Sequence, residues 1–222
     1  MQPEGSGWKA QMLKVTEIYT SIQGETTFAG FPCTFVRLAG CNLRCSWCDT
    51  AYAWSGGESL DRREIIRRLR DGPSLVTVTG GEPLLQAETP ALVADLLREG
   101  FTVLVETNGT LPVEPLDPDC VRILDIKPPS SGYCDRTRWS NLDHLLPWDE
   151  VKIVIADRED YSWALEVIRT REICRKVVVN FSAAHGRLAP AELARWVLED
   201  GIEVRVNLQL HRVLWPGEER GR

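Results

Sequence analysis

Short apolar runs, rich in valine, isoleucine and leucine, recur along the chain and predict the strands of a sheet. The first run, 13–19, alternates apolar with polar residues, as a strand with one solvated face does. The later runs are nearly continuous, which is typical of strands buried on both faces of a parallel sheet. These runs are 34–38, 75–79, 102–106, 122–126, 150–155, 176–181 and 203–207.

Helical spacing of apolar residues occurs between several of these runs. Segments 61–70, 89–98 and 190–199 each place large apolar side chains on one face. Gly100 stops the second segment, and Pro190 suits the first turn of the third. Strands that alternate with helices indicate an α/β fold with the helices packed outside a parallel sheet. About six such units fall short of a closed eight-unit barrel. We therefore predict a partial, open (β/α)6 barrel, with a flat doubly wound sheet as the alternative.

The composition is that of an ordinary globular protein, and it removes several classes of function. The 222 residues fit one domain, and the formal net charge of −6 has both signs scattered along the chain. This charge argues against a broad nucleic-acid or anionic-membrane surface. No apolar run approaches the roughly 18 residues of a membrane helix, and Met1–Gly7 lacks the pattern of a secretory signal. We expect a cytoplasmic protein with no nucleic-acid partner and no membrane partner.

Three of the seven cysteines, Cys41, Cys45 and Cys48, lie within eight residues, and the other four are dispersed. A cytosolic chain keeps its thiols reduced, so a disulfide framework is not expected. The short spacings allow one loop to turn all three sulfurs toward a common point. A four-iron cluster ordinarily takes four cysteine ligands. With three, one iron would stay open for a substrate, as one position of a catalytic zinc does.

Other interpretations of this loop stay open from the residues alone. A structural zinc site normally shows paired Cys-x2-Cys spacings or a partner histidine, and no histidine follows before His144. A fully ligated electron-transfer cluster would recruit a distant cysteine such as Cys120 or Cys134. The three cysteines would otherwise be ordinary free thiols.

Polar clusters follow three of the predicted strands at the point where each ends. They are Thr79-Gly-Gly-Glu-Pro83, Glu106-Thr-Asn-Gly109 and Asp125-Ile-Lys-Pro-Pro129. In parallel barrels the active site forms at this rim. Paired glycines let a backbone approach a ligand closely, and a glutamate there can accept a hydrogen bond from an amine. Lys152, inside a predicted strand, is either a charge on an edge strand or a buried cation that points into the barrel.

The Cys-x3-Cys-x2-Cys loop followed by the Gly-Gly-Glu-Pro turn resembles the radical S-adenosylmethionine superfamily. Within that superfamily the chain is similar to the 7-carboxy-7-deazaguanine synthase family over most of its length. The more discriminating likeness lies in Ser-Ile-Gln-Gly-Glu at 21–25 and in Asp-Thr directly after Cys48. Further matching segments are 17–20, 35–42 and 209–211, together with Trp215.

The resemblance implies a single radical S-adenosylmethionine domain over 1–222, in which the strand segment 13–31 completes the substrate pocket. The implied reaction contracts the ring of 6-carboxy-5,6,7,8-tetrahydropterin to 7-carboxy-7-deazaguanine with loss of ammonia, in queuosine and deazapurine biosynthesis. A [4Fe–4S] cluster would cleave S-adenosylmethionine to a 5′-deoxyadenosyl radical, which takes hydrogen from C6 of the pterin and later recovers it. The resemblance also implies a homodimer and an electron donor such as a flavodoxin or a ferredoxin.

The same resemblance implies roles for individual residues. Cys41, Cys45 and Cys48 would each hold one iron, and Thr50 would bind magnesium, a cation that keeps much of its hydration. The substrate-binding positions would be Ile22, Gln23, Gly24, Arg37 and Thr79, with Arg37 suited to a carboxylate. The positions that bind S-adenosylmethionine would be Gly81, Glu82, Asp125, Ile126 and Lys127.

Two rival functions follow from the same residues. A glycyl-radical activase would share the cluster loop and the Gly-Gly-Glu-Pro turn, but it would need a groove for a protein loop. A non-catalytic binding module, stabilised by an iron–sulfur cluster or by zinc, is the alternative from another class. The tail 215–222 differs from the tails of the family, and Gln209 and His211 either line the site or finish the barrel.

Overall fold

A computed structural model describes residues 12–218 and 220–221 of the chain. The expectation for Met1–Gly7, and part of the expectation for the tail, lie outside these residues. The strands are β1 (Leu13–Ile22), β2 (Pro32–Leu38), β3 (Glu58–Leu60), β4 (Leu75–Gly80), β5 (Thr102–Thr107), β6 (Val121–Asp125), β7 (Glu150–Ile155), β8 (Val178–Ala183) and β9 (Arg205–Val206). The α-helices are α1 (Arg62–Leu69), α2 (Thr89–Arg98), α3 (Arg158–Thr170), α4 (Pro190–Asp200) and α5 (Leu210–Leu214).

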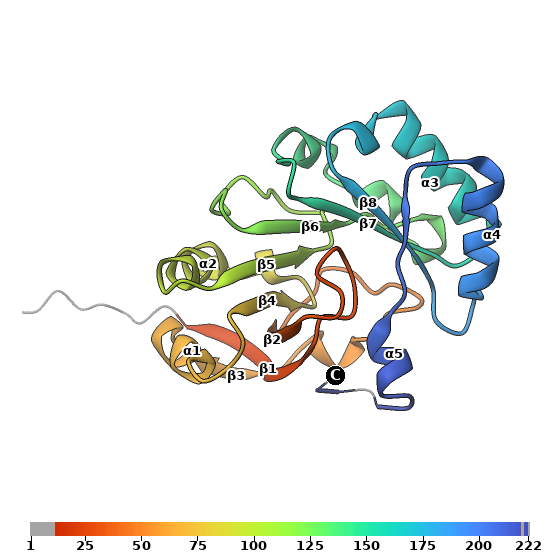
Figure 1. Cartoon of the computed structure of the whole chain (residues 1–222). Coiled ribbons are helices and arrows are strands. Elements are labelled where there is room, and N and C mark those ends of the chain that lie inside the picture. Colours follow the sequence, from red (N-terminus) through yellow and green to blue (C-terminus); the bar gives the residue numbers. More distant parts are fainter. Residues whose placement is uncertain (1–11, 219, 222) are drawn as a thin grey trace, which may run out of the picture.

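All nine strands belong to one curved sheet in the order β3-β1-β2-β4-β5-β6-β7-β8-β9 (Figure 1). The six strands from β2 to β8 run parallel to one another, and β1 and β3 are added antiparallel at one edge. Because β3 and β9 form two separate edges, the sheet does not close. The predicted α/β class and partial six-unit barrel are confirmed.

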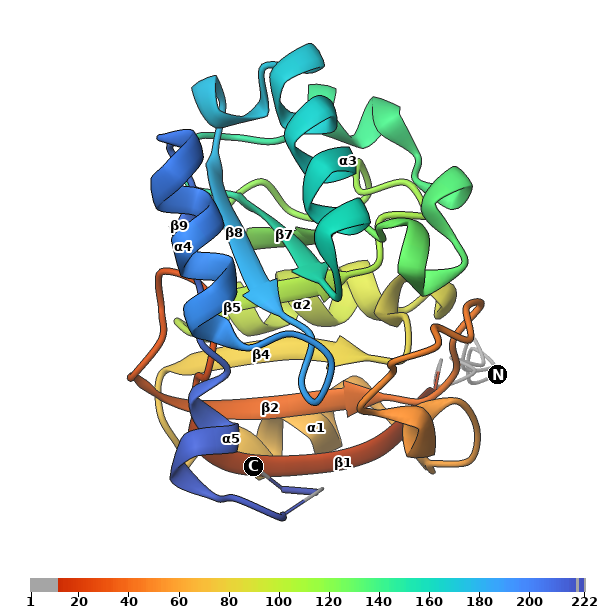
Figure 2. The ribbon, with the colours of Figure 1, turned by 90° about the vertical axis from the view of Figure 1, so that its right-hand side faces the viewer.

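Four helices connect the strands and cover the sheet. Figure 1 shows α1 and α2 on one side of the view and α3 and α4 on the other. Figure 2 shows α5 beside one end of β1 and β2. Only short 3-10 helices, Pro129–Ser131, Cys134–Arg136 and Trp139–Asp143, occur between β6 and β7. No helix among the described residues is long and apolar enough to cross a membrane.

Alternation along the strands separates an apolar face from a face that carries the chemistry. Outward positions such as Val36, Val76, Val105 and Ile153 join the helices in the main core. On the other face, Cys33, Phe35, Leu104 and Ile123 form a smaller apolar cluster near the beginnings of the strands. Further along, that face carries Arg37, Thr79, Glu106, Asp125 and Lys152, all of which line one cavity. Single polar residues within or at the end of the apolar strands therefore point inward.

Local capping explains where two of the helices begin. The Asp61 carboxylate accepts a hydrogen bond from the backbone N–H of Glu64 at 2.8 Å, which caps α1. Ile65 and Leu69 on the next turns are buried in the core. The Asp157 side chain caps α3 in the same way by accepting from the backbone N–H of Asp160 at 2.9 Å.

The structure differs from the sequence pattern in several elements. The predicted helices correspond to α1, α2 and α4, whereas α3, α5 and β3 were not predicted. The predicted strand 176–181 begins before the observed strand β8, which starts at Val178. The Lys176 N–H instead donates to the carbonyl oxygen of Ile173 in a 3-10 turn. The predicted strand 203–207 is wrong in extent: only Arg205–Val206 pair with β8, and the chain then turns toward the cavity.

Candidate active site

One cavity of about 430 Å³ opens at the ends of the parallel strands, where the polar clusters were expected to meet. Its walls include the inward strand positions, the cysteine loop 41–50, the segment 184–187 after β8, and the C-terminal residues Gln209, His211 and Arg212. The substrate positions Ile22, Gln23, Gly24, Arg37 and Thr79 all line it. Segments more than 180 residues apart in sequence therefore form one site.

The three cysteine thiols of the loop face this cavity together. Cys41, Cys45 and Cys48 line it and are partly exposed, whereas the other four cysteines of the chain do not. Burial raises the pKa of the Cys45 thiol to about 11 and that of Cys41 above its usual range. Burial thus favours the protonated thiols. A bound metal would reverse this preference, because its positive charge favours the thiolates that bind it.

This arrangement fits a cluster better than a single ion. No group of three His, Cys, Asp or Glu side chains within the described ranges is placed to hold one metal ion. In a four-iron cluster, each cysteine binds a different iron, so the sulfurs need only surround a common volume. Cys120 is fully buried elsewhere in the core, so it offers no fourth ligand at the cavity. The residues present fit a [4Fe–4S] cluster with one iron free of protein ligands.

The loop is tied to the segment that follows β6. The Ser46 hydroxyl donates to the carbonyl oxygen of Ser130 at 2.8 Å, and the Trp47 indole N–H donates to the Ser130 hydroxyl at 3.0 Å. Ser130 is fixed in turn by Asp160, whose carboxylate accepts from the Ser130 backbone N–H at 2.9 Å. Asp160 is fully buried at the start of α3. The cysteine loop is thus joined through Ser130 to the start of α3.

The Gly-Gly turn after β4 packs directly against the start of the cysteine loop. A Cβ atom on Gly80 would lie 2.3 Å from the carbonyl oxygen of Leu38, and one on Gly81 would lie 2.3 Å from that of Gly40. Only glycine allows this approach. The backbone of Gly81 therefore reaches the cavity wall beside Cys41, at the position expected for a cofactor contact.

Glu82 follows Gly81, and the resemblance implies that it contacts S-adenosylmethionine. Its side chain is fully buried and does not line the cavity. The carboxylate accepts hydrogen bonds from the backbone N–H of Asn108 at 2.7 Å, the Thr107 hydroxyl at 2.8 Å and the backbone N–H of Leu84 at 2.9 Å. Burial raises the pKa of Glu82 to about 7. Glu82 thus joins the turn after β4 to the turn after β5 from behind the cavity wall.

The side chains of the segment after β6 lie partly in the cavity wall and partly in the core. Lys127 donates to Asp125 Oδ2 at 2.7 Å, and both side chains line the cavity, whereas Ile126 is fully buried and does not. Asp125 Oδ1 is buried and has no hydrogen-bond partner among the described residues. A buried acceptor without a donor costs about 1–3 kcal/mol, so it fits a site that a ligand donor completes. The Lys127 ammonium also lies 5.1 Å from the centre of the Trp47 ring.

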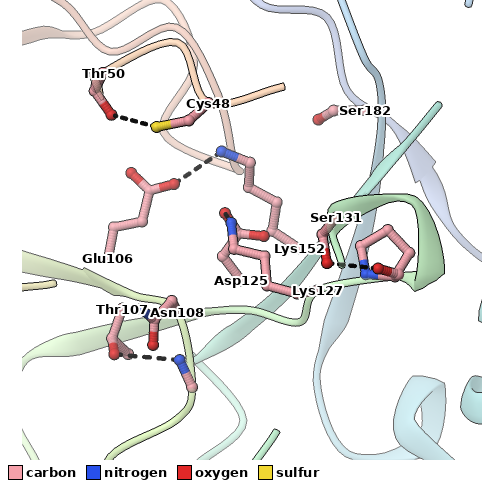
Figure 3. Close-up of polar contacts among 12 residues, drawn as sticks. Cys48, Thr50, Glu106, Thr107, Asn108, Asp125, Lys127, Ser131, Lys152 and Ser182 are labelled. Carbon is pink, nitrogen blue, oxygen red and sulfur yellow. Dashed lines mark hydrogen bonds and ion pairs between the residues drawn. The ribbon is translucent and has the colours of Figure 1, made fainter. Parts of the chain in front are cut away.

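The predicted substrate residues have well-defined partners. Arg37 donates to Glu17 Oε1 at 2.7 Å and to the Tyr19 hydroxyl at 2.8 Å, and these contacts fix its guanidinium against one wall. The Gln23 amide donates to the Thr77 hydroxyl at 2.9 Å, so its side chain is turned toward the barrel wall. Thr50 lines the cavity with its hydroxyl 3.8 Å from the Cys48 sulfur (Figure 3).

An ion-pair triad on the cavity floor was not assigned a role from the sequence. Lys152 is buried, and its ammonium lies 2.6 Å from Glu25 Oε2 and 2.8 Å from Glu106 Oε1. Figure 3 shows Lys152 and Glu106 reaching toward each other from their strands. The buried-cation interpretation of Lys152 is therefore the right one. The signal in the sequence was a charged residue at an inward position of an otherwise apolar strand.

Residues 209–212 close the cavity beside the substrate segment. The backbone N–H of Leu210 donates to the carbonyl oxygen of Gly24 at 3.1 Å. His211 lies so close that a Cβ on Gly24 would be 2.7 Å from its Nδ1 atom. Burial lowers the pKa of His211. Gln209 and His211 both line the cavity, so they contribute to the site as well as to the end of the barrel.

Comparison with known proteins places this geometry in a family. The profile of the Radical SAM superfamily matches residues 36–125. The chain is 43% identical over 226 residues to the 7-carboxy-7-deazaguanine synthase of Koribacter versatilis, covering 94% of this chain and 100% of that protein. The chain belongs to the 7-carboxy-7-deazaguanine synthase family. The enzyme of that name from Chlorobaculum tepidum is 44% identical over 214 residues, covering 94% of this chain and 97% of that protein.

A solved structure supports the fold of this family member independently. The crystal structure of QueE from Escherichia coli matches with a TM-score of 0.72 and 22% identity, covering 89% of this chain and 94% of that chain. Membership of the family makes the chain a radical S-adenosylmethionine enzyme, with a [4Fe–4S] cluster and S-adenosylmethionine as cofactors. It also implies a small-molecule substrate and a reductant.

Proposed function

We propose that the chain contracts 6-carboxy-5,6,7,8-tetrahydropterin to 7-carboxy-7-deazaguanine with loss of ammonia, in the biosynthesis of queuosine and related deazapurines. The single observation that carries this proposal is the shared cavity, in which the cysteine loop faces the segment Ile22–Gly24 and Arg37. Family membership supplies the reaction, since relatives that match almost the whole chain bear the synthase name.

The cofactors and the protein divide the work between them. When bound, the cluster and S-adenosylmethionine supply the 5′-deoxyadenosyl radical, the difficult part of the chemistry. Cys41, Cys45 and Cys48 would hold the cluster. The Gly81 backbone, the unpaired Asp125 Oδ1 atom and Lys127 would position S-adenosylmethionine beside it. Ser130 accepts the hydrogen bond of the Trp47 indole and lies shortly after Lys127 in the chain. The segment after β6 would therefore position both the cysteine loop and S-adenosylmethionine.

Arg37 and Thr50 have the chemistry to hold the substrate carboxylate. Arg37 directs two of its N–H groups to Glu17 and Tyr19, and its remaining donors can pair with a carboxylate in the cavity. Thr50 offers one hydroxyl oxygen at the cavity wall, which suits a magnesium ion that keeps most of its water and also binds substrate oxygens. The C-terminal residues beside Gly24 would exclude water from the radical reaction.

The activity is tested by an anaerobic assay of reconstituted protein with the pterin, S-adenosylmethionine, magnesium and a reductant, followed by mass spectrometry. We expect 7-carboxy-7-deazaguanine, with S-adenosylmethionine surviving many turnovers. Deoxyadenosine and methionine without the deazapurine would show intact radical chemistry on a different substrate. A glycyl radical formed on a partner protein would instead favour the activase, although Ile22–Glu25 build a small-molecule cavity.

A flavodoxin or ferredoxin is the proposed electron donor, and the surface of the cysteine loop supports it. Arg44 donates to the carbonyl oxygens of Cys41 and Leu43 at 2.8 and 2.7 Å, and Arg187 donates to that of Ser46 at 3.2 Å. Both arginines are exposed, so the loop presents two fixed positive charges. An acidic electron carrier would be attracted to the surface nearest the cluster.

A homodimer and a cytoplasmic location complete the proposal. Leu208, Val213 and Leu214 are 48%, 67% and 49% exposed around α5, and a second copy of the chain would cover them. Light scattering of the holoenzyme would give the mass of the assembly directly. All seven cysteines are free thiols, which suits a reducing compartment and an oxygen-sensitive cluster.

A further inference from the structure

The tip of the cysteine loop is held by one serine from the segment after β6. Ser46 and Trp47 form this tip, between Cys45 and Cys48. The Ser46 hydroxyl donates to the carbonyl oxygen of Ser130, and the Trp47 indole N–H donates to the Ser130 hydroxyl. Ser130 therefore contacts both residues that separate the second cysteine of the loop from the third.

The Asp160 carboxylate determines which way the Ser130 hydroxyl points. Asp160 is fully buried, and its carboxylate accepts hydrogen bonds from the backbone N–H of Ser130, at 2.9 Å, and from the Ser130 hydroxyl. A hydroxyl has a single hydrogen, and here it goes to a carboxylate that can only accept. The Trp47 indole N–H can only donate, so it needs a lone pair that this orientation leaves free. The three groups therefore form a relay with one direction, from Trp47 through Ser130 to Asp160.

The same carboxylate also fixes the apolar surface that supports the Trp47 ring. Asp160 Oδ2 accepts from the backbone N–H of Ala156 at 2.9 Å. Ala156 forms a small buried cluster with Val154 and Ala184, and Trp47 packs against this cluster. The polar edge of the indole and its apolar contacts are thus both tied to Asp160.

Capping of α3 does not account for this carboxylate. Asp160 lies in the first turn of that helix, where a negative charge is favourable. However, the Asp157 side chain already caps the helix. The hydrogen bonds to the Asp160 side chain come from Ser130 and Ala156, which both lie outside α3. They are directed to the segments that support the cysteine loop.

We propose that Asp160 is a positioning residue for the [4Fe–4S] cluster. Through Ser130 it orients Trp47, and the orientation of Trp47 sets where the sulfurs of the flanking Cys45 and Cys48 can lie. Without the relay the tip of the loop is free to shift, and the irons bound by these two sulfurs become easier to remove. The proposal concerns the cofactor site and does not depend on which substrate the enzyme takes.

The first cysteine of the loop has a different support. Asn108 Nδ2 donates to Asn42 Oδ1 at 3.0 Å, and Asn42 Nδ2 donates to the Thr110 hydroxyl at 2.7 Å. Asn42 directly follows Cys41, so these contacts fix the start of the loop from the turn after β5. Loss of the relay should therefore loosen the second half of the loop and leave Cys41 in place, so that a cluster still assembles.

The relay is tested by the rate at which a ferrous chelator removes iron from the anaerobic holoenzyme, followed by the absorbance of the cluster. Ser130→Ala removes the bridging hydroxyl but keeps the carbonyl oxygen that accepts from Ser46. It should release iron about 10-fold faster, the effect of one lost buried hydrogen bond. Asp160→Asn should have a similar effect, because its amide leaves the backbone N–H of Ser130 or of Ala156 facing another N–H group.

Two control variants and a second readout separate positioning from general stability. Ser130→Thr keeps the hydroxyl and should release iron at the wild-type rate. Ser131→Ala removes the neighbouring hydroxyl, which donates to the carbonyl oxygen of Pro128 at 2.6 Å, and should also behave as wild type. The EPR spectrum of the dithionite-reduced cluster should show shifted g values in Ser130→Ala and Asp160→Asn, and wild-type g values in both controls.

A double variant tests whether Trp47 and Ser130 act through one hydrogen bond. In the Trp47→Phe background the indole N–H is absent, so adding Ser130→Ala should accelerate iron release little further. Multiplication of the two effects would overturn the relay. Wild-type release rates and g values in Ser130→Ala would do the same, whether or not Asp160→Asn folds. Release from Ser131→Ala as fast as from Ser130→Ala would assign the effect to the whole turn and remove Asp160 from it. The assay contains no pterin, so each of these outcomes leaves the proposed function untouched.

Discussion

Replacing Glu82 by glutamine should change how the stability of the enzyme depends on pH. The folded protein raises the pKa of this buried carboxyl from its ordinary 4.5 to about 7, chiefly through burial. One pKa unit corresponds to about 1.4 kcal/mol, so the full effect is about 3 kcal/mol. Because the folded state holds the proton more tightly, the Glu82 contribution to the free energy of unfolding is present below pH 4.5. It is lost as the pH rises through about 7.

Glutamine cannot titrate, so the variant should lack this decline. We expect the free energy of unfolding of the variant, minus that of the wild type, to increase by up to about 3 kcal/mol between pH 4.5 and pH 8. Anaerobic urea unfolding at several pH values measures it, and contributions common to both proteins cancel in the difference. The exposed Glu99→Gln is the control. Parallel pH profiles for wild type and Glu82→Gln would refute the reasoning.

Three further variants test the cluster, the substrate and the electron donor. Cys45→Ala should abolish both the cluster absorbance and deoxyadenosine formation, and activity in this variant would contradict the cluster assignment. Arg37→Ala should leave the cluster intact but raise the KM for the pterin at least about 10-fold, since it removes a charged hydrogen bond; unchanged kinetics would exclude Arg37 from the site. Arg44→Glu with Arg187→Glu should slow cluster reduction by reduced flavodoxin about 10-fold at low salt and leave reduction by dithionite unchanged. Equal slowing with both reductants would point to damage to the loop.

The fold could be predicted from the sequence because each of its main strands shows a local pattern of apolar residues. Each strand of the parallel sheet was visible as a short apolar run, and the polar clusters that follow three of these runs marked the cavity rim. Helix α3 was missed, although Tyr161, Leu165 and Ile168 make its inner face apolar. The strand 203–207 was overestimated because pairing with β8, and not residue preference, decides how far an edge strand extends.

Within the site, short motifs were easier to predict than the contacts that support them. The three cysteines were expected from their spacing to face a common point, and all three line the cavity. The hydrogen-bond partners of the Glu82 side chain could not be predicted, because Thr107 and Asn108 come from the next strand. The pairing of Lys152 with Glu25 spans 127 residues, and no local pattern encodes it. Contacts of this kind depend on which strands become neighbours.

The opening between the two edges of the sheet, where the barrel does not close, is bridged by a few polar contacts and not by strand pairing. Across it, the Thr26 backbone N–H donates to Asn207 Oδ1 at 3.1 Å, and the Leu210 N–H donates to the carbonyl oxygen of Gly24 at 3.1 Å. Each such bond contributes only about 1 kcal/mol net. Because these contacts are not part of any strand pairing, they can break while the hydrogen-bonded order of the sheet stays intact.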